Sequence, residues 1–484
     1  MENMESGLGR RGFLAAAFAA YAASGCRSFG LCGAKPNIVF GVISDLHVTT
    51  PESTIAFRRA LAYFRDRGVD AVVVTGDLSD WGLRSGFKYV ADTWYDVFPD
   101  DRAPDGRKVE KIFCTGNHDY EGYWYGDMTL DMHVQGYSEE EALVKLGMKK
   151  CWEEAFREPF AQVRRRTVKG YDFISSEWKD GKDGFKEAEA WFAANGKTLD
   201  PKKPFFVLTH YPFRNTTSCS EGDAYGDATL KKYPNAVAFT GHVHWTLNDE
   251  HSIWQGEYTA IAVPSMSYTS IPWGRENGGA KRNGKCNRSM QCLPAREFLR
   301  EAQGYVVSVF DDRMEIERRD FTEGVEAAPT WIVTPPAGDA SRYAHANSRK
   351  RTPVPQFPVG ASVKTYTSNF ETRSYNWTIM MMLEFPSASV RGGRVFDYEV
   401  RAEMEDGTVA AVKYFLAPAF YRLERDEPKS QRFAFDAMDL PEHGKYRLRV
   451  YPRNCFGDCG KPISSAVLES KPGKAKSPVW KNEV

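Results

Sequence analysis

The stretch PNIVFGVISDLH, residues 36–47, decides how the first half of the chain is built, because an unbroken apolar run ends there in an aspartate and a histidine. Such an apolar run predicts a strand that is buried on both faces. Residues 53–68, STIAFRRALAYFRDRG, have helical spacing with a polar cap and a terminating glycine. VDAVVVTGDLSD, residues 69–80, is a second apolar run of the first kind. The order strand, helix, strand predicts a layered α/β domain.

The same apolar pattern recurs along the chain. We expect four further strands and then a hairpin, at residues 110–119, 203–212, 235–244, 256–265 and 303–321. Residues 120–200 are polar with helical spacing, so we expect helices there. Helix-covered sheets carry their functional groups beyond the carboxyl ends of the strands, so the residues that end each strand are the place to look for chemistry.

The chain changes character near residue 326. Residues 326–360 are rich in proline, alanine and polar residues, and we expect a linker there. Residues 361–484 contain short alternating runs typical of strands, which predicts an all-β sandwich domain. Within it LPEHGKYRLRVYPRNCFG, residues 440–457, resembles the tyrosine corner and following strand of fibronectin type III-like domains, with Tyr446 as the corner.

The residues GRRGFLAAAFAAYAASGC, 9–26, resemble a twin-arginine export signal that ends in a lipoprotein cleavage site. Their apolar part is shorter than the roughly 20 residues of a membrane-spanning helix. We therefore expect an export signal over residues 1–26, a linker over 27–36, a location in the periplasm or cell envelope, and membrane attachment through a lipid on Cys26. The alternative is an uncleaved apolar helix on a cytoplasmic protein.

Charge and cysteine content limit the class of protein. With 484 residues the chain is long enough for about two or three domains. Lysine plus arginine and aspartate plus glutamate number 64 each, so no basic excess points to a nucleic-acid polymer as partner. None of the nine cysteines has zinc-finger spacing. Cys455 and Cys459, like Cys286 and Cys292, are close enough in sequence to pair, whereas Cys114 ends a buried strand and is expected to be a free thiol.

Five of the predicted strands end in side chains that bind metals, and five of the nine histidines lie in these endings. In chain order the endings contain Asp45, His47, Asp77, Asp80, Asn117, His118, Asp119, His210, His242 and His244. Imidazole, carboxylate and amide ligands suit zinc, manganese and iron. The set is too large for one ion and fits two ions about 3.5–4 Å apart that share one carboxylate. Gly76, Gly116 and Gly241 each precede a ligand, where a Cβ would crowd the cluster.

The pattern D-x-H, G-D-x-x-D, G-N-H-D, H and G-H-x-H, in this order, resembles the calcineurin-like metallophosphoesterase family. Each short motif is weak alone, but five in order on predicted strand ends form a specific signal. The resemblance implies that residues 37–325 are a metallophosphoesterase domain of the α/β class, with a layered β-sandwich core flanked by helices. It also implies two divalent metal ions, manganese, iron or zinc, as cofactors.

The resemblance implies a role for each residue that matches a motif. One ion would be held by Asp45, His47 and His244, and the other by Asn117, His210 and His242. Asp77 would bridge the two ions. His118 would either give a proton to the leaving oxygen or place a positive charge on the phosphoryl oxygens. Asp119 would orient His118, and Asp80 would support a ligand from behind. Alternation along the last strand end would send both histidines of G-H-x-H to one side, one to each ion.

The implied reaction is the hydrolysis of a phosphate monoester or diester by attack of a metal-bridging hydroxide. We expect a phosphorylated small molecule or a lipid headgroup as substrate, with Arg214 and Tyr120 as candidate contacts to it. No nucleophile motif such as G-x-S-x-G offers a rival mechanism. The alternative function is a cell-surface binding protein, in which the metal domain is structural and the sandwich binds a glycan or a protein.

Overall fold

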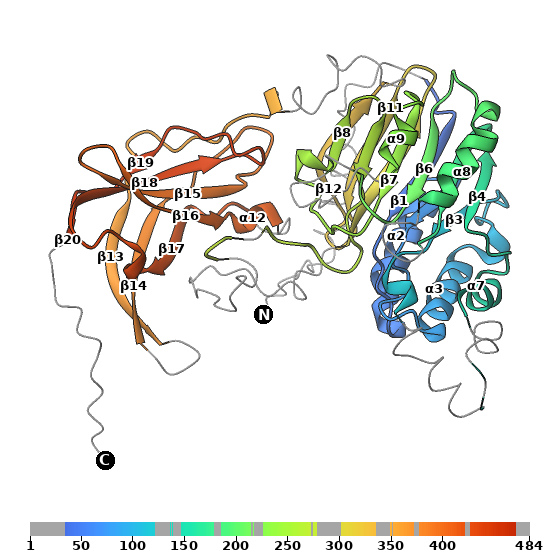
Figure 1. Cartoon of the computed structure of the whole chain (residues 1–484), viewed down its shortest axis with the longest axis horizontal. Coiled ribbons are helices and arrows are strands. Elements are labelled where there is room, and N and C mark those ends of the chain that lie inside the picture. The colour runs from blue at the N-terminus through green and yellow to red at the C-terminus, as the bar shows by residue number, and fades with distance from the viewer. Residues whose placement is uncertain are drawn as a thin grey trace, which may run out of the picture.

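The computed structural model describes most of the chain. The described residues are 34–121, 136, 138, 147–178, 185–213, 216, 226–272, 274–277, 302–334, 349–350, 352–371, 377–421 and 426–470. The expected export signal, Arg214 and the pair Cys286 and Cys292 lie outside them. Figure 1 shows two parts, an α/β domain coloured blue to yellow and an all-β domain in orange and red. No helix within the described ranges is long and apolar enough to cross a membrane.

The first sheet of the α/β domain is mixed. In spatial order its strands are β12 (Val325–Val333), β11 (Met314–Asp320), β10 (Gln303–Val309), β1 (Ile38–Ile43), β2 (Ala71–Thr75) and β3 (Glu110–Cys114). β1, β2 and β3 run parallel, and β10 joins β1 antiparallel. Every residue of β2 is buried, because the sheet is covered on both faces. β10 and β11 form the hairpin that the sequence predicted.

The second sheet is also mixed. In spatial order its strands are β4 (Val163–Val168), β5 (Tyr171–Ser176), β6 (Phe205–Thr209), β7 (Ala236–Thr240), β9 (Thr259–Ala262) and β8 (Ile253–Gln255). β5, β6, β7 and β9 run parallel, and an antiparallel strand closes each edge. The ends of β6 and β7 therefore open at the same edge of this sheet.

The two sheets face each other across one apolar core. Phe40 of β1 contacts Phe206 of β6 edge-on, with ring centroids 4.7 Å apart. Helices α2 (Ile55–Asp66), α3 (Arg84–Val97) and α7 (Met148–Phe156) share a second core with the first sheet, and α8 (Lys186–Asn195) and α9 (Asp227–Leu230) share a third with the second sheet. Single 3₁₀ turns are η1 (Pro51–Thr54), η2 (Pro99–Asp101), η3 (His118–Tyr120), η5 (Gly196–Thr198) and η6 (Glu250–Ser252). The expected helix-flanked β-sandwich core is confirmed.

The all-β domain consists of two antiparallel sheets, as expected. One sheet contains β13 (Lys364–Glu371), β14 (Trp377–Pro386) and β17 (Ser430–Asp436). The other contains β16 (Val409–Leu416), β15 (Asp397–Met404), β18 (Gly444–Arg453), β19 (Ile463–Ser464) and β20 (Leu468–Ser470). Two single turns, α12 (Pro418–Tyr421) and η8 (Ala437–Asp439), connect strands. Tyr446 of β18, the expected corner residue, is buried in the core that both sheets share.

Three strands lie where the sequence predicted other structure. The hairpin of β4 and β5 lies within the region expected to be helical. The arginines of β4 interrupt the apolar pattern that would predict a strand. In the structure they form ion pairs, Arg164 with Glu177 at 2.5 Å and Arg165 with Asp172 at 2.6 Å. β12 runs to Val333, inside the expected linker, because most of its residues are partly exposed and give no apolar run.

Cys455 and Cys459, close enough in sequence to pair, are both free thiols. Asn454 Oδ1 accepts hydrogen bonds from the backbone N–H groups of Phe456 and Asp458, each at 3.0 Å, and these close a tight turn. The turn places Cys455 beside Asp249 of the α/β domain and leaves Cys459 exposed. Cys114 is buried and free, as expected.

Candidate metal centre

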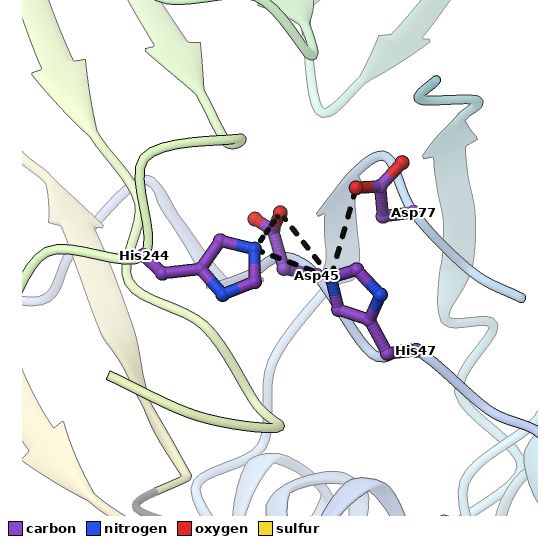
Figure 2. Close-up of side chains that lie close together, drawn as sticks. All are labelled: Asp45, His47, Asp77 and His244. Atoms are coloured by element: carbon purple, nitrogen blue, oxygen red, sulfur yellow. Dashed lines mark hydrogen bonds and ion pairs between the residues drawn. The ribbon is translucent and has the colours of Figure 1, made fainter. Parts of the chain in front are cut away.

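The loops that follow five strands meet at one edge of the two sheets and bring the predicted ligands together. Loops after β1, β2 and β3 come from the first sheet, and those after β6 and β7 come from the second. The side chains form two neighbouring groups. The first group is Asp45, His47 and His244, and the second group is Asn117, His210 and His242. Asp77 lies between the groups, and Figure 2 shows it with the first group.

The first group is compact and buried. His244 Nε2 lies 2.8 Å from Asp45 Oδ1 and 3.2 Å from His47 Nε2. His47 Nε2 is also 3.7 Å from Asp77 Oδ2. The four side chains are almost fully removed from solvent. The ligand atoms therefore converge on a volume of the size that one cation needs.

The second group has the same arrangement around an amide. Asn117 Oδ1 lies 3.1 Å from His210 Nε2 and 3.0 Å from His242 Nδ1. His210 Nε2 is 3.1 Å from Asp77 Oδ2, the same oxygen that faces His47. Asp77 thus presents one oxygen to both groups, which is the geometry of a bridging carboxylate.

Hydrogen bonds on the far side of three rings set their tautomers. His47 Nδ1 lies 2.7 Å from Asp80 Oδ1, His210 Nδ1 lies 2.8 Å from the carbonyl oxygen of Thr75, and His244 Nδ1 lies 3.2 Å from the carbonyl oxygen of Tyr268. Each Nδ1 must donate, because its partner only accepts. Each Nε2 then turns a lone pair toward the centre.

The centre is consequently lined by acceptors that face one another. Two lone pairs, those of His47 and His244, approach to 3.2 Å with no donor assigned between them. Asp77 Oδ2 is buried without a hydrogen-bond partner among the described residues. A buried oxygen left this way costs free energy unless a cation or proton compensates it. The residues therefore fit two divalent metal ions.

The charges of the buried side chains act against one another in the second group. Burial lowers the pKa of His210, but the Asp77 carboxylate outweighs it and raises that pKa to about 9. Burial and the neighbouring His210 together lower the pKa of His242 to about 4. Only one of the two rings therefore accommodates a positive charge, and a cation between them would take the place of that proton.

The backbone of the centre is unusual. Asp45, His47, Asp77, His242 and His244 all have positive φ, between 47° and 75°. Left-handed conformations are rare for residues other than glycine and asparagine, and they gather at functional sites. The expectation that strand alternation aims His242 and His244 was wrong, since β7 ends at Thr240 and both residues lie in the loop beyond it. The left-handed loop sends one ring to each group.

The three glycines beside the ligands are required by close approach. A Cβ on Gly76 would press on the His210 ring, and one on Gly116 would press on the Asp77 carboxylate. A Cβ on Gly241 would lie 2.7 Å from Asp45 Oδ2. Each clash involves a side chain of the centre, as the sequence predicted.

His118 lies at the open side of the first group. Its ring centroid is 4.7 Å from that of His47, and its side chain is 29% exposed. The backbone carbonyl of Asp80 accepts a hydrogen bond from its Nδ1 at 2.9 Å, and Glu121 Oε1 lies 3.3 Å from the same atom. Nε2 is therefore the end of the ring that remains for a substrate.

Asp119 does not orient His118, contrary to expectation. Its carboxylate accepts backbone hydrogen bonds from Gly116 at 2.8 Å, Ser79 at 2.8 Å and Leu78 at 3.2 Å. Burial, followed by repulsion from Asp77, raises its pKa to about 7. Asp119 thus joins the loops after β2 and β3. Asp80, by contrast, supports His47 from behind, the position that the resemblance implied.

Three aromatic residues that the sequence analysis missed stand beside the centre. The ring of Tyr268 lies 4.1 Å from that of His244, and the ring of Tyr211 lies 5.0 Å from that of His242. Trp178 packs against Tyr211 at 5.7 Å. All three follow strands of the second sheet, so attention to every strand end would have found them. Tyr120 instead turns its hydroxyl to Thr115 Oγ1, 3.3 Å away.

A comparison with protein families agrees with this geometry. Residues 38–246 match the family described as calcineurin-like phosphoesterase. Among solved structures, a dimetal phosphatase from Danio rerio is similar at 12% identity and TM-score 0.35, over 62% of this chain and 99% of that one. The anchor in the inner membrane complex of Plasmodium is similar at 13% identity and TM-score 0.36, over 61% and 88%. A search of curated proteins finds no match. On the strength of the family match and the ligand geometry, residues 38–246 form a calcineurin-like phosphoesterase domain.

Proposed function

We propose that this protein is an exported phosphoesterase that hydrolyses a phosphate monoester or diester with two divalent metal ions. The observation that carries the proposal is Asp77 Oδ2, a buried oxygen without a hydrogen-bond partner among the described residues, which faces both ligand groups. The family match supports the reaction class. The identity of the ions, manganese, iron or zinc, is left open by a ligand set of imidazole, carboxylate and amide.

The side chains divide the binding between them. Asp45, His47 and His244 would hold one ion, and Asn117, His210 and His242 would hold the other. Asp77 would contact both. When bound, two divalent cations supply Lewis acidity, which lowers the pKa of water and neutralises charge on phosphoryl oxygens. The protein contributes a ligand frame that is already assembled, because its rings are set by Asp80, Thr75 and Tyr268.

His118 is the residue placed for proton transfer. Its Nδ1 is engaged by the carbonyl of Asp80, so Nε2 is free to donate a proton to the oxygen that leaves phosphorus. Glu121 and the Asp80 carboxylate lie within 3.5 Å of Nδ1, which gives a protonated ring two anionic partners. Partial exposure lets the ring meet a substrate that enters from solvent.

The substrate that fits best is a phosphorylated small molecule with an organic group. Tyr268 lies beside the first ligand group, and Tyr211 with Trp178 lies beside the second. Aromatic faces of this kind favour contact with rings, sugars or apolar carbon next to a phosphate. A lipid headgroup belongs to the same class, and Arg214 remains a candidate contact from the sequence.

Hydrolysis of nitrophenyl phosphate and bis-nitrophenyl phosphate with added Mn²⁺ tests the proposal. We expect activity on at least one ester and about two metal ions per chain by elemental analysis. Asp77→Ala should lose both activity and metal, because Asp77 Oδ2 lies near a histidine of each group, 3.7 Å from His47 Nε2 and 3.1 Å from His210 Nε2. His443→Ala, an exposed histidine of the all-β domain, is the matched control. An inactive wild type, or a fully active Asp77→Ala variant, would refute the mechanism.

The rival function, a surface binding protein with a structural metal domain, is distinguished by metal content. A chain that binds no metal after expression in metal-replete medium would favour the rival. Export is proposed from the paired arginines Arg10 and Arg11 and the residues that lead to Cys26. Cell fractionation with a Cys26→Ser variant tests it, since the variant should leave the membrane fraction if Cys26 carries a lipid.

A further inference from the structure

We propose that the all-β domain positions His244 for metal binding, so that the centre depends on a domain whose described residues include none of its ligands. The inference rests on the proposed role of His244 as a metal ligand. Two segments carry it. The first docking segment is residues 245–251, directly after His244, and the second docking segment is residues 265–272 with 274–277. Both contact the ligand group at one end and the all-β domain at the other.

The second docking segment holds His244 on two sides. The carbonyl oxygen of Tyr268 accepts the hydrogen bond from His244 Nδ1 at 3.2 Å, and Ser270 N–H donates to the carbonyl oxygen of His244 at 2.8 Å. Ser265 Oγ donates to the carbonyl oxygen of Asp45 at 3.0 Å. These contacts set the tautomer of His244 and the backbone positions of two ligands, so any shift of the segment moves the first group.

The far end of the second docking segment is fastened to the all-β domain. Asn277, fully buried, accepts a hydrogen bond from Leu416 N–H at 2.7 Å and donates one to the Leu416 carbonyl oxygen at 2.9 Å. Glu276 N–H donates to the carbonyl oxygen of Tyr414 at 2.8 Å. The segment thereby makes backbone-directed bonds at the end of β16, and these bonds specify one position.

An ion pair and an apolar contact add to this fastening. Arg275 pairs with Asp397 at 2.8 Å, and Arg453 pairs with the same buried carboxylate at 2.6 Å. Ile271, three residues after Tyr268, packs in an apolar cluster with Phe396, Leu416, Phe420 and Tyr421 of the all-β domain. Since Ile271 is so close in sequence to Tyr268, its packing restrains the carbonyl group that His244 needs.

The first docking segment fixes the other side of His244. Asn248 Nδ2 donates to the carbonyl oxygen of Phe420 at 2.8 Å. The ring of His251 lies 4.4 Å from that of Phe456, and His251 Nδ1 lies 2.6 Å from Asp249 Oδ1. Trp245, next to His244, donates from its indole N–H to the same aspartate. The first and the second docking segment therefore each connect His244 to the all-β domain.

Asn277→Ala in the full-length protein tests the inference. Partners that orient a metal ligand directly are worth about 10–100-fold in metal affinity, and Asn277 acts more remotely, so we expect Mn²⁺ to bind one of the two sites about 3- to 10-fold more weakly. Isothermal titration calorimetry with Mn²⁺ measures this. The control is Gln431→Ala, which removes a buried amide with two hydrogen bonds, at 2.9 and 2.7 Å, elsewhere in the all-β domain.

The outcomes separate the inference from the proposed function. Weaker Mn²⁺ binding in Asn277→Ala but not in Gln431→Ala supports it. Equal affinity of Asn277→Ala and wild type, within twofold, overturns the inference and leaves the two-metal function intact. A wild type that binds no Mn²⁺ overturns both. If Asn277→Ala does not fold, Arg275→Gln takes its place, because it loses the pair with Asp397 while Arg453 still compensates the buried carboxylate.

Discussion

The replacement Asp80→Ala should weaken metal binding at the first ligand group by about tenfold. Asp80 Oδ1 accepts a hydrogen bond from His47 Nδ1 at 2.7 Å, and its side chain is 30% exposed. Hydrogen bonds to charged acceptors contribute about 1.5–3 kcal/mol, and the exposure of Asp80 favours the lower end. A loss of about 1.4 kcal/mol is a tenfold change in affinity. Calorimetric titration with Mn²⁺ should show one weakened site and one unchanged site.

Two companion variants make the Asp80 experiment decisive. Asp80→Asn keeps an acceptor for His47 and loses only the charge, so its affinity should fall between those of wild type and Asp80→Ala. Asp92→Ala removes a carboxylate that is 56% exposed and paired with Lys88 on a helix surface, and its affinity should equal that of wild type. Mn²⁺ affinity of Asp80→Ala within twofold of wild type would show that Asp80 does not support His47.

Three further outcomes are expected. His118→Ala should lower turnover by about 10²–10⁴-fold while both ions remain bound, and loss of metal would instead make His118 a ligand. Gly241→Ala should reduce metal content, since its Cβ would lie 2.7 Å from Asp45 Oδ2, whereas Gly393→Ala, whose Cβ meets only Val390 at 3.6 Å, should not. Burial raises the pKa of Glu427 from 4.5 to about 7. Protonation of Glu427 therefore stabilises the folded protein by roughly 3 kcal/mol. This stabilisation is complete below about pH 4.5 and is lost as the pH rises through 7. Glu427→Gln should flatten this dependence in urea unfolding between pH 5 and 8, and an unchanged slope would contradict it.

The parts of the site that the sequence predicted are those that follow from strand order. Apolar runs ending in Asp45, Asp77 and Asn117 had to bring these residues to one sheet edge, because parallel strands end together. The need for glycine before the ligands was predictable for the same reason, because a Cβ at these positions would meet side chains at the same sheet edge. The apolar pattern and the strand order were enough to predict which residues form the centre. The division of these residues into two ligand groups came from the resemblance.

The parts that the sequence did not predict depend on contacts between distant residues. Asp119 follows His118 directly, yet its carboxylate turns to backbone amides of another loop. The sequence of β4 has the pattern of a charged surface segment, and its arginines are neutralised by Asp172 of the neighbouring strand β5 and by Glu177, which directly follows that strand. Tyr268 supports His244 through its backbone carbonyl, which no side-chain pattern reveals.

The left-handed backbone of five ligand residues allows two effects of a substitution to be measured separately, the effect on folding and the effect on metal binding. Asp45, His47, Asp77, His242 and His244 each hold a conformation that costs an ordinary residue roughly 1–2 kcal/mol. Replacement of His242 by glycine or asparagine would remove its ring and relieve or tolerate that conformation, whereas replacement by valine would remove the ring and add strain. In a saturation library selected for folding, the residues tolerated at these positions should therefore be those that adopt positive φ readily. In a library selected for turnover, the tolerated residues should be those that can also bind the metal.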